Sequence, residues 1–177
     1  MAASLWRGYL RLLEKFPLRT MASTTGTLMA TGDCISQFAV EKKSTKEYDI
    51  VRTGRFFVFG FCVIGPMMRG WYFTLDKLYA GKNLAALKMM ATDQLCGAPV
   101  FISVFICGMS VLRMESLDEI KAKFKRDFIP IMTNNYKVWP ASQFINFYFL
   151  PLQHRVLFVN FIALGWNTYL AWASEKK

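Results

Sequence analysis

The region from Val138 to Ser174 constrains the fold most, because its 37 residues carry a single formal charge, Arg155. Uncharged amides recur within it every seven residues, which places them along one side of a helix, drifting by roughly 20° per repeat. A water-soluble helix has a broad polar face that includes charges. A narrow polar line on an apolar helix instead suits a helix in lipid that faces other helices or a water-filled path. The repeating amides are Asn146, Gln153, Asn160 and Asn167.

The composition of the chain favours the same placement. Charged residues make up 19% of the 177 residues, against about 25% in soluble domains, and the mean hydropathy is +0.24. The net charge of +10 comes from cations scattered over separate segments rather than one dense basic patch. We therefore expect no direct binding of nucleic acid, and we expect the lipid bilayer, with its anionic headgroups, to be the partner of these cations.

The hydropathy pattern predicts a single all-α, multi-pass membrane domain over residues 1–177, with kinked helices and interfacial amphipathic helices. A continuous helix over Val138–Ser174 would be about 55 Å long, whereas the hydrocarbon core is about 30 Å thick, so we expect it to bend near Pro151. Both termini would then lie on one side. We expect four transmembrane helices at 18–40, 54–76, 91–112 and 153–172, interfacial helices at 4–16 and 115–128, and a bent or partly inserted segment at 138–150. The first of these interfacial segments also fits an Arg-bearing targeting element.

Small residues and prolines predict how these helices pack and bend. Ala22, Gly26 and Ala30 recur every four residues and form a ridge that lets helix backbones approach closely in lipid. Prolines inside apolar stretches predict kinks, because proline lacks the backbone N–H of the helical ladder. These prolines are Pro66, Pro99, Pro140 and Pro151.

The charges that we expect to lie within the membrane are Asp33, Asp93 and Arg155. A lone charge at mid-bilayer costs about 3 kcal/mol on insertion scales, so we expect at least one ion pair, with Asp33–Arg155 as a candidate. The polar residues that we expect to line a pore or form a polar core are Gln153, Asn160, Asn167, Asn146 and Gln143. Two interpretations stay open for them: a water-filled path, or hydrogen bonds between helices worth about 0.5–2 kcal/mol each.

The chain lacks the sequence patterns of the common enzyme classes. It has no nucleophile elbow, P-loop, dinucleotide fingerprint or metalloprotease motif. We therefore expect no catalytic, cofactor-binding or metal site. The cysteines occupy apolar stretches without C-x-x-C spacing, which indicates buried thiols, although a pair that joins on oxidation stays open. They are Cys34, Cys62, Cys96 and Cys107.

The C-terminal region carries a resemblance to a known family. The block from Trp139 to Phe147, WPASQFINF, is followed by Trp166-Asn167-Thr168-Tyr169-Leu170, and Asp93-Gln94 occurs earlier. The chain resembles the Mpv-seventeen/peroxisomal membrane protein family, and within it the mitochondrial inner-membrane branch more than the peroxisomal one.

That resemblance implies four spans and no catalytic activity. It also implies a weakly selective channel, possible as a homo-oligomer, that passes ions or small metabolites and affects membrane potential, reactive-oxygen handling and maintenance of mitochondrial DNA. The alternatives are a non-conducting scaffold and a carrier of small metabolites of the nucleotide type.

Overall fold

The computed structural model describes residues 2–149 and 152–175, with side chains at 7–145, 149 and 158–175. The described residues form helices and connecting turns without a strand, which confirms the all-α prediction. The elements are α1 (Ala2–Lys15), α2 (Pro17–Ile35), η1 (Ser36–Val40), α3 (Ile50–Phe59), η2 (Gly60–Ile64), α4 (Gly65–Tyr79), α5 (Ala85–Thr92), η3 (Asp93–Gly97), α6 (Ala98–Leu112), α7 (Leu117–Tyr148) and α8 (Leu152–Glu175).

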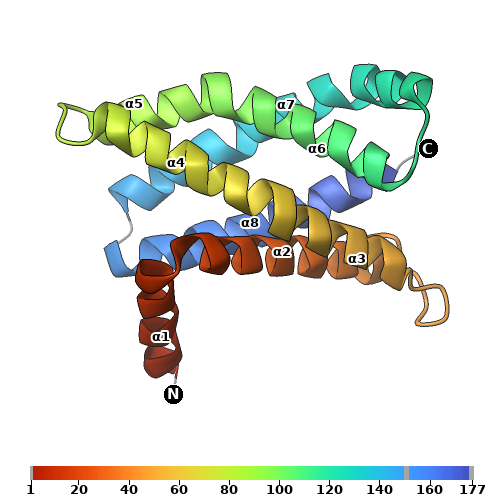
Figure 1. The fold of residues 1–177 in the computed structure, drawn as a ribbon, viewed down its shortest axis with the longest axis horizontal. Helices are drawn as coiled ribbons and strands as arrows, with labels where there is room; N and C mark the ends of the chain where they lie inside the picture. Colours follow the sequence, from red (N-terminus) through yellow and green to blue (C-terminus); the bar gives the residue numbers. More distant parts are fainter. Residues whose placement is uncertain (1, 150–151, 176–177) are drawn as a thin grey trace.

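The long helices run side by side along one axis in alternating directions, while α1 projects from one end of the bundle (Figure 1). Single π-helical turns join α3 to α4 and α5 to α6, so that each pair forms one continuous rod. Each rod is also apolar enough, by length and composition, to cross a membrane: Ile50–Tyr79 and Ala85–Leu112.

The π-helical turns lie immediately before two of the prolines expected to kink the helices. Pro66 and Pro99 each occupy the first turn of the α-helix that follows, α4 and α6. A proline cannot donate to the carbonyl four residues earlier and clashes with it. A π-helical turn widens the ladder at that point, so each rod continues through its proline without a break. Pro140 lies inside α7, as does Pro130.

Helix α7 differs from the sequence-based expectation. The predicted interfacial helix at 115–128 and the bent segment at 138–150 are joined in one helix of 32 residues, about 48 Å long. A capping box at Ser116 and Glu119 begins it. The stretch between the two segments stays helical because α7 packs against α6 on one side and α8 on the other.

The course of α7 also bears on the position of the termini. It returns the chain to the end of the bundle that carries α1, and α8 then runs back, so that the C-terminal end of α8 lies at the end opposite α1 (Figure 1). This arrangement differs from the expectation that both termini share one side of the membrane. The cause is the long α7, which crosses the full length of the bundle where the sequence indicated only surface and bent segments.

The predicted small-residue ridge lies where α2 crosses the α3–α4 rod. Ala22 and Gly26 are buried there, whereas Ala30 is only partly buried. A Cβ added to Gly60 would lie 2.8 Å from the Cα of Gly26. The absence of side chains therefore lets the two backbones touch at this crossing. On its other face α2 meets α8, where Gly32 lies against Asn167.

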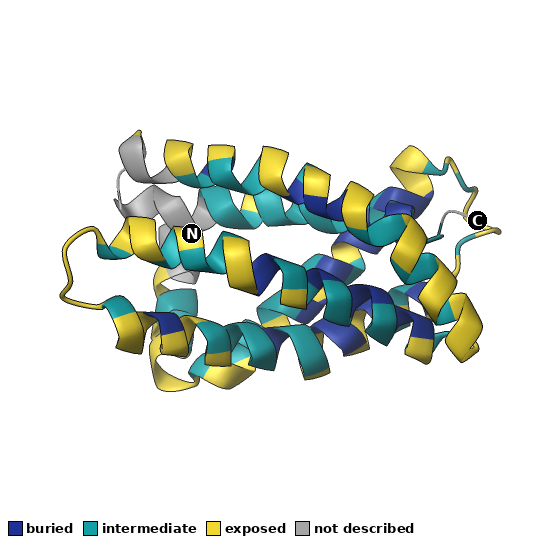
Figure 2. Cartoon of the chain, turned by 90° about the horizontal axis from the view of Figure 1, so that it is seen from above, coloured by how far each residue is buried: buried dark blue, intermediate teal, exposed yellow. Residues whose placement is uncertain are grey.

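The hydrophobic core fills the half of the bundle that holds the C-terminus, where buried residues concentrate (Figure 2). Aromatic side chains of α3 and α6 dominate it, with Phe56 and Phe59 each packed against Phe105 at 6.3 Å between ring centroids. Met109 and Ile131 extend the core between α6 and α7. The half nearer α1 is less completely filled, and the cavity described below lies there.

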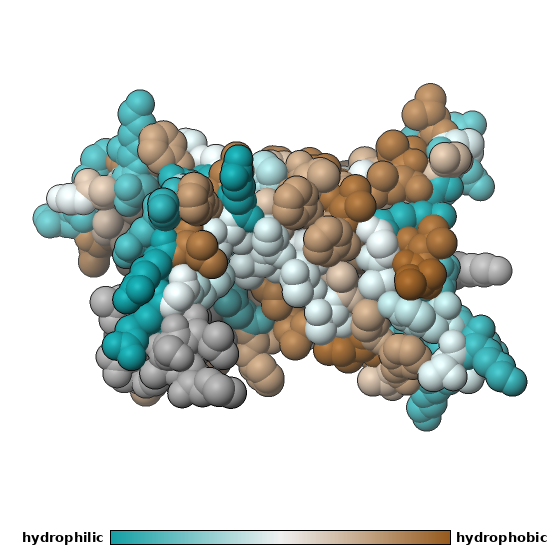
Figure 3. Space-filling view, turned by 60° about the horizontal axis from the view of Figure 1, so that its bottom comes forward, coloured by the Kyte–Doolittle hydropathy of each residue, from teal (hydrophilic) through white to brown (hydrophobic). Residues whose placement is uncertain are grey.

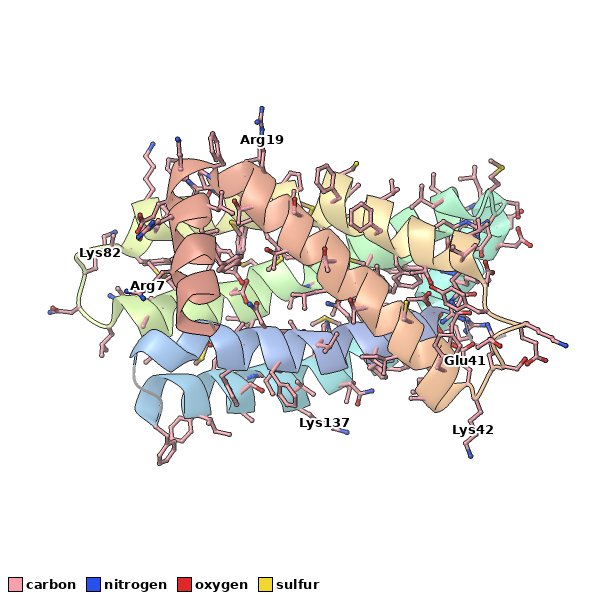
Figure 4. All side chains as sticks on the ribbon, turned by 90° about the horizontal axis from the view of Figure 1, so that it is seen from below. Arg7, Arg19, Glu41, Lys42, Lys82 and Lys137 are labelled. Atoms are coloured by element: carbon pink, nitrogen blue, oxygen red, sulfur yellow. The ribbon has the colours of Figure 1, made fainter. Side chains whose placement is uncertain are left out.

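The face shown in Figure 3 has hydrophilic side chains at both ends and side chains of intermediate to high hydropathy in the middle. Large apolar side chains face outward along the rods, such as Phe57, Val58, Phe61, Val100 and Val111. In Figure 4, Arg19 and Lys82 lie at the α1 end and point away from the bundle, while Glu41 and Lys42 lie at the opposite end. An apolar middle between two charged ends suits a protein that crosses a bilayer.

Candidate functional site

A cavity of about 270 Å³ lies inside the bundle, in the half nearer α1. Side chains of α1, α2, α4, α6, α7 and α8 line it together with residues of η2 and η3. At the inner end its walls reach Met29, Phe105 and Leu170, which belong to the hydrophobic core. The described lining residues stop there, so the packed half of the bundle closes the cavity on the side of the C-terminus.

Amide side chains from η3, α7 and α8 converge on this cavity. Three of the predicted polar residues, Gln143, Asn160 and Asn167, line it. The structure adds Gln94 and Asn135, whose side chains also line it. Asn135 was missed because it follows a charged segment that the sequence placed on the membrane surface.

The cavity amides differ in their bonding. Asn135 Nδ2 donates to Gln94 Oε1 at 3.0 Å, which ties α7 to η3. Asn160 and Asn167 form no side-chain hydrogen bond with the other described residues, so these two amides are available to water or a ligand. The side chains of Asn146, Gln153 and Arg155, as well as Pro151, lie outside the described residues. Asn135 thus bonds between helices, while a water-filled path along Asn160 and Asn167 stays a prediction.

Asp93 is the only charged residue among the described residues that line the cavity. Its Oδ1 accepts a hydrogen bond of 2.7 Å from Trp71 Nε1, and its Oδ2 lies 3.4 Å from Gln94 Nε2. The ion pairs of the described residues do not include it. Gly97 makes room for this arrangement, because a Cβ there would lie 2.8 Å from both Asp93 Oδ1 and Trp71 Nε1.

Asp33 lies outside the cavity, in a buried polar cluster at the opposite end of α2. Its Oδ1 lies 2.6 Å from Arg52 Nε, and its Oδ2 accepts from Gln37 and Thr53 at 2.8 and 2.6 Å. Arg52 also binds Glu41 through two hydrogen bonds of 2.7 and 2.9 Å. This cluster of Asp33, Gln37, Glu41, Arg52 and Thr53, in which one cation serves two acids, is called the buried ion cluster below; Lys43 lies 3.0 Å from Glu41 at its edge.

The candidate pair Asp33–Arg155 was wrong, since Asp33 pairs with Arg52. Gly32, next to Asp33, lies against Asn167 of α8. Residue 155 is twelve positions earlier on α8, or about 18 Å along the axis. Arg52 was overlooked because the predicted span began at residue 54, whereas α3 begins at Ile50 after the N-cap Asp49.

Glu41 anchors the outer side of the buried ion cluster. Burial alone would raise the pKa of its carboxyl group, but hydrogen bonds from Arg52, Lys43 and Ser36 lower the pKa from 4.5 to about 2. Glu41 therefore stays ionised at neutral pH and holds the Arg52 guanidinium from the side opposite Asp33.

The cysteines and potential metal ligands form no cluster among the described residues. Cys62 and Cys96 are exposed, Cys34 and Cys107 are partly buried, and all four are free. The described residues include no group of three or more side chains that could hold a metal ion. The chemistry of the site therefore rests on amides, hydroxyls, aromatic rings and one carboxylate.

These features together define a helical membrane protein with a largely apolar cavity, into which several amides and one carboxylate converge, among its membrane-length helices. Comparison with known proteins identifies its family. The model of the Mpv17/PMP22 family matches residues 110–171. The chain is 43% identical to the mitochondrial inner membrane protein Mpv17 of Xenopus laevis over 175 residues, covering 98% of this chain and 99% of that protein. It is 39% identical to protein SYM1 of Gibberella zeae over 177 residues, with the same coverage.

The chain belongs to the Mpv17/PMP22 family and is a protein of the mitochondrial inner membrane. The human relative, also named mitochondrial inner membrane protein Mpv17, is 37% identical over 174 residues. The predicted family and the predicted location in the mitochondrial inner membrane are both confirmed, in preference to the alternative location in the peroxisomal membrane. No solved structure matches the chain.

Proposed function

We propose that this protein is a weakly selective channel of the mitochondrial inner membrane, and that its cavity forms part of the conducting path. The observation that carries the proposal is the convergence of five amide side chains from η3, α7 and α8 on one internal cavity. Amides and hydroxyls replace part of the hydration shell of a permeating solute without binding one charge tightly, which suits weak selectivity. Effects on membrane potential, reactive-oxygen handling and mitochondrial DNA would follow from such a leak.

The cavity ends at the hydrophobic core, so conduction requires the packed half of the bundle to open. The same one-ended shape supports a second candidate, a carrier of small metabolites, because a carrier exposes its cavity to one side at a time. Four crossing helices follow from the family resemblance. In the fold, α7 runs the length of its neighbours and helps to enclose the cavity. This arrangement supports α7 as a fifth crossing helix.

Reconstitution of the purified protein in planar bilayers tests the channel. Wild type is expected to show discrete conductance, and Asn160→Leu or Asn167→Leu is expected to change its size. Asn83→Leu, an exposed amide between α4 and α5, is the matched control and should leave it unchanged. Silence at high protein density, together with saturable solute uptake into liposomes, would favour the carrier. Silence in both assays would favour a non-conducting scaffold.

A further inference from the structure

The charge of Asp93 sets it apart from the other intramembrane acid. Asp33 lies 2.6 Å from a guanidinium nitrogen, whereas Asp93 receives hydrogen bonds from the neutral groups of Trp71 and Gln94. An ionised carboxylate among apolar helices is costly without a cation. No Lys or Arg is among the described residues that line the cavity beside Asp93. A cation that enters the cavity would supply the charge that the described lining residues do not.

The cavity that Asp93 lines also has aromatic walls. Gln94, next to Asp93, is hydrogen-bonded to Asn135, and Trp139 follows Asn135 by one turn on the same face of α7. Trp139 in turn meets Trp166 of α8, with ring centroids 6.3 Å apart and an interplanar angle of 75°. A carboxylate and two indole rings thus border the same space. This is the pairing of groups that recognises alkylammonium ions, through charge attraction and cation–π contact.

We propose that the cavity binds a small alkylammonium cation, whose charge pairs with Asp93 and whose methyl or methylene groups pack against Trp139 and Trp166. The proposal deepens the proposed function, since the ligand occupies the same cavity. The volume of about 270 Å³ is close to the lower limit of about 300 Å³ for small-molecule pockets, which suits a compact ligand. Two of the cations at the α1 end, Arg19 and Lys82, point away from the bundle (Figure 4).

Isothermal titration calorimetry of the full chain in maltoside micelles, which carry no ammonium group, tests the proposal. Choline is the probe, and neohexyl alcohol, in which a carbon replaces the nitrogen, is its neutral isostere. Choline is expected to bind at least about tenfold more tightly than the isostere, since Coulomb attraction to the carboxylate plus cation–π attraction exceeds 1.4 kcal/mol. Equal affinity for the two, or no binding of either, would overturn the proposal.

Two variants with matched controls assign the site. Asp93→Asn is expected to weaken choline binding by about tenfold or more and leave the isostere unaffected, whereas Asp76→Asn, an exposed acid of α4, changes neither. Asparagine retains the oxygen that accepts from Trp71 Nε1, and circular dichroism checks that the fold persists. Trp139→Leu is expected to weaken choline several-fold more than the isostere, and Phe161→Leu, an exposed aromatic of α8, is the control. Unchanged choline binding in Asp93→Asn would refute the assignment.

Glycerophosphocholine distinguishes a lipid headgroup from a free amine as the source of the ligand. Binding at least as tight as that of choline indicates the headgroup. Weaker binding indicates a free cation, because the phosphate meets no cationic side chain among the described lining residues. Both results support the alkylammonium chemistry. If the protein binds choline but does not conduct, the proposed channel function is wrong and the alkylammonium site stands. If the protein conducts but does not bind choline, the alkylammonium site is wrong and the proposed channel function stands.

Discussion

Asp33 Oδ1 lies 2.6 Å from Arg52 Nε, and the two side chains are 0% and 4% exposed. The pair joins α2 to α3 at the end of the bundle away from the cavity. Glu41 holds the same guanidinium from outside, so that one cation is shared by two acids. Removing one member of a buried ion pair leaves an uncompensated charge, and this penalty dominates its energetics.

Arg52→Gln is expected to destabilise the protein by about 3–5 kcal/mol, because it leaves Asp33 buried without a cation. Asp33→Asn should be milder, since Arg52 keeps Glu41. The double variant should cost less than the sum of the two single variants. Unfolding by a denaturing detergent in micelles measures all three. Lys42→Gln, an exposed cation of the adjoining loop, is the control. Additive effects would show that the pair is not coupled.

Gly65→Ala is expected to destabilise the protein by about 1–3 kcal/mol, because a Cβ there would lie 2.5 Å from the Cα of Ala22. The added methyl group would meet the backbone of Ala22, which cannot rotate away as a side chain can. Gly70→Ala, five residues later on the same helix, is the matched control, since nothing lies within 4 Å of its added Cβ. Thermal unfolding in micelles compares the two. Equal stability would contradict the close approach of α2 and α4.

Acidification is expected to weaken the buried ion cluster through Glu41. The pKa of Glu41 is lowered in the folded state from 4.5 to about 2, so its contribution is fully present above pH 4.5 and is lost as the pH falls through about 2. Glu41→Gln should therefore be less stable than wild type at neutral pH, with a difference that narrows between pH 4.5 and 2.

Unfolding measured across that pH range tests this prediction. Asp76→Asn, an exposed acid at the opposite end of the bundle, controls for general effects of removing a carboxyl group. A difference between Glu41→Gln and wild type that stays constant down to pH 2 would mean that the pKa of the Glu41 carboxyl is the same in the folded and unfolded states.

Tags placed before α1 and after α8 are expected to lie on opposite sides of the inner membrane, because α7 returns the chain before α8 runs back (Figure 1). Protease protection in intact mitochondria, mitoplasts and detergent-opened mitoplasts measures their accessibility. A known matrix protein and a known intermembrane-space protein serve as controls. If both tags become accessible to the protease at the same stage of opening, both termini lie on one side of the inner membrane and the prediction is wrong.

The sequence by itself determined that the chain is helical, belongs in a membrane and carries a line of amides in its C-terminal region. These properties are local: hydropathy, helical spacing and the scarcity of charges in Val138–Ser174 do not depend on which helix packs against which. The recurring motifs around Trp139 and Trp166 likewise pointed to the family directly.

Tertiary structure alone decided which polar groups meet. Arg52 reaches Asp33 because α3 begins earlier than hydropathy indicated and crosses α2 at a small-residue contact. Asn135 joins the cavity because packing between α6 and α8 keeps the prolines and charges of α7 within one helix. Partners far apart in the chain are selected by burial and by the need to satisfy charges out of water. Those energies exist only once the helices have packed.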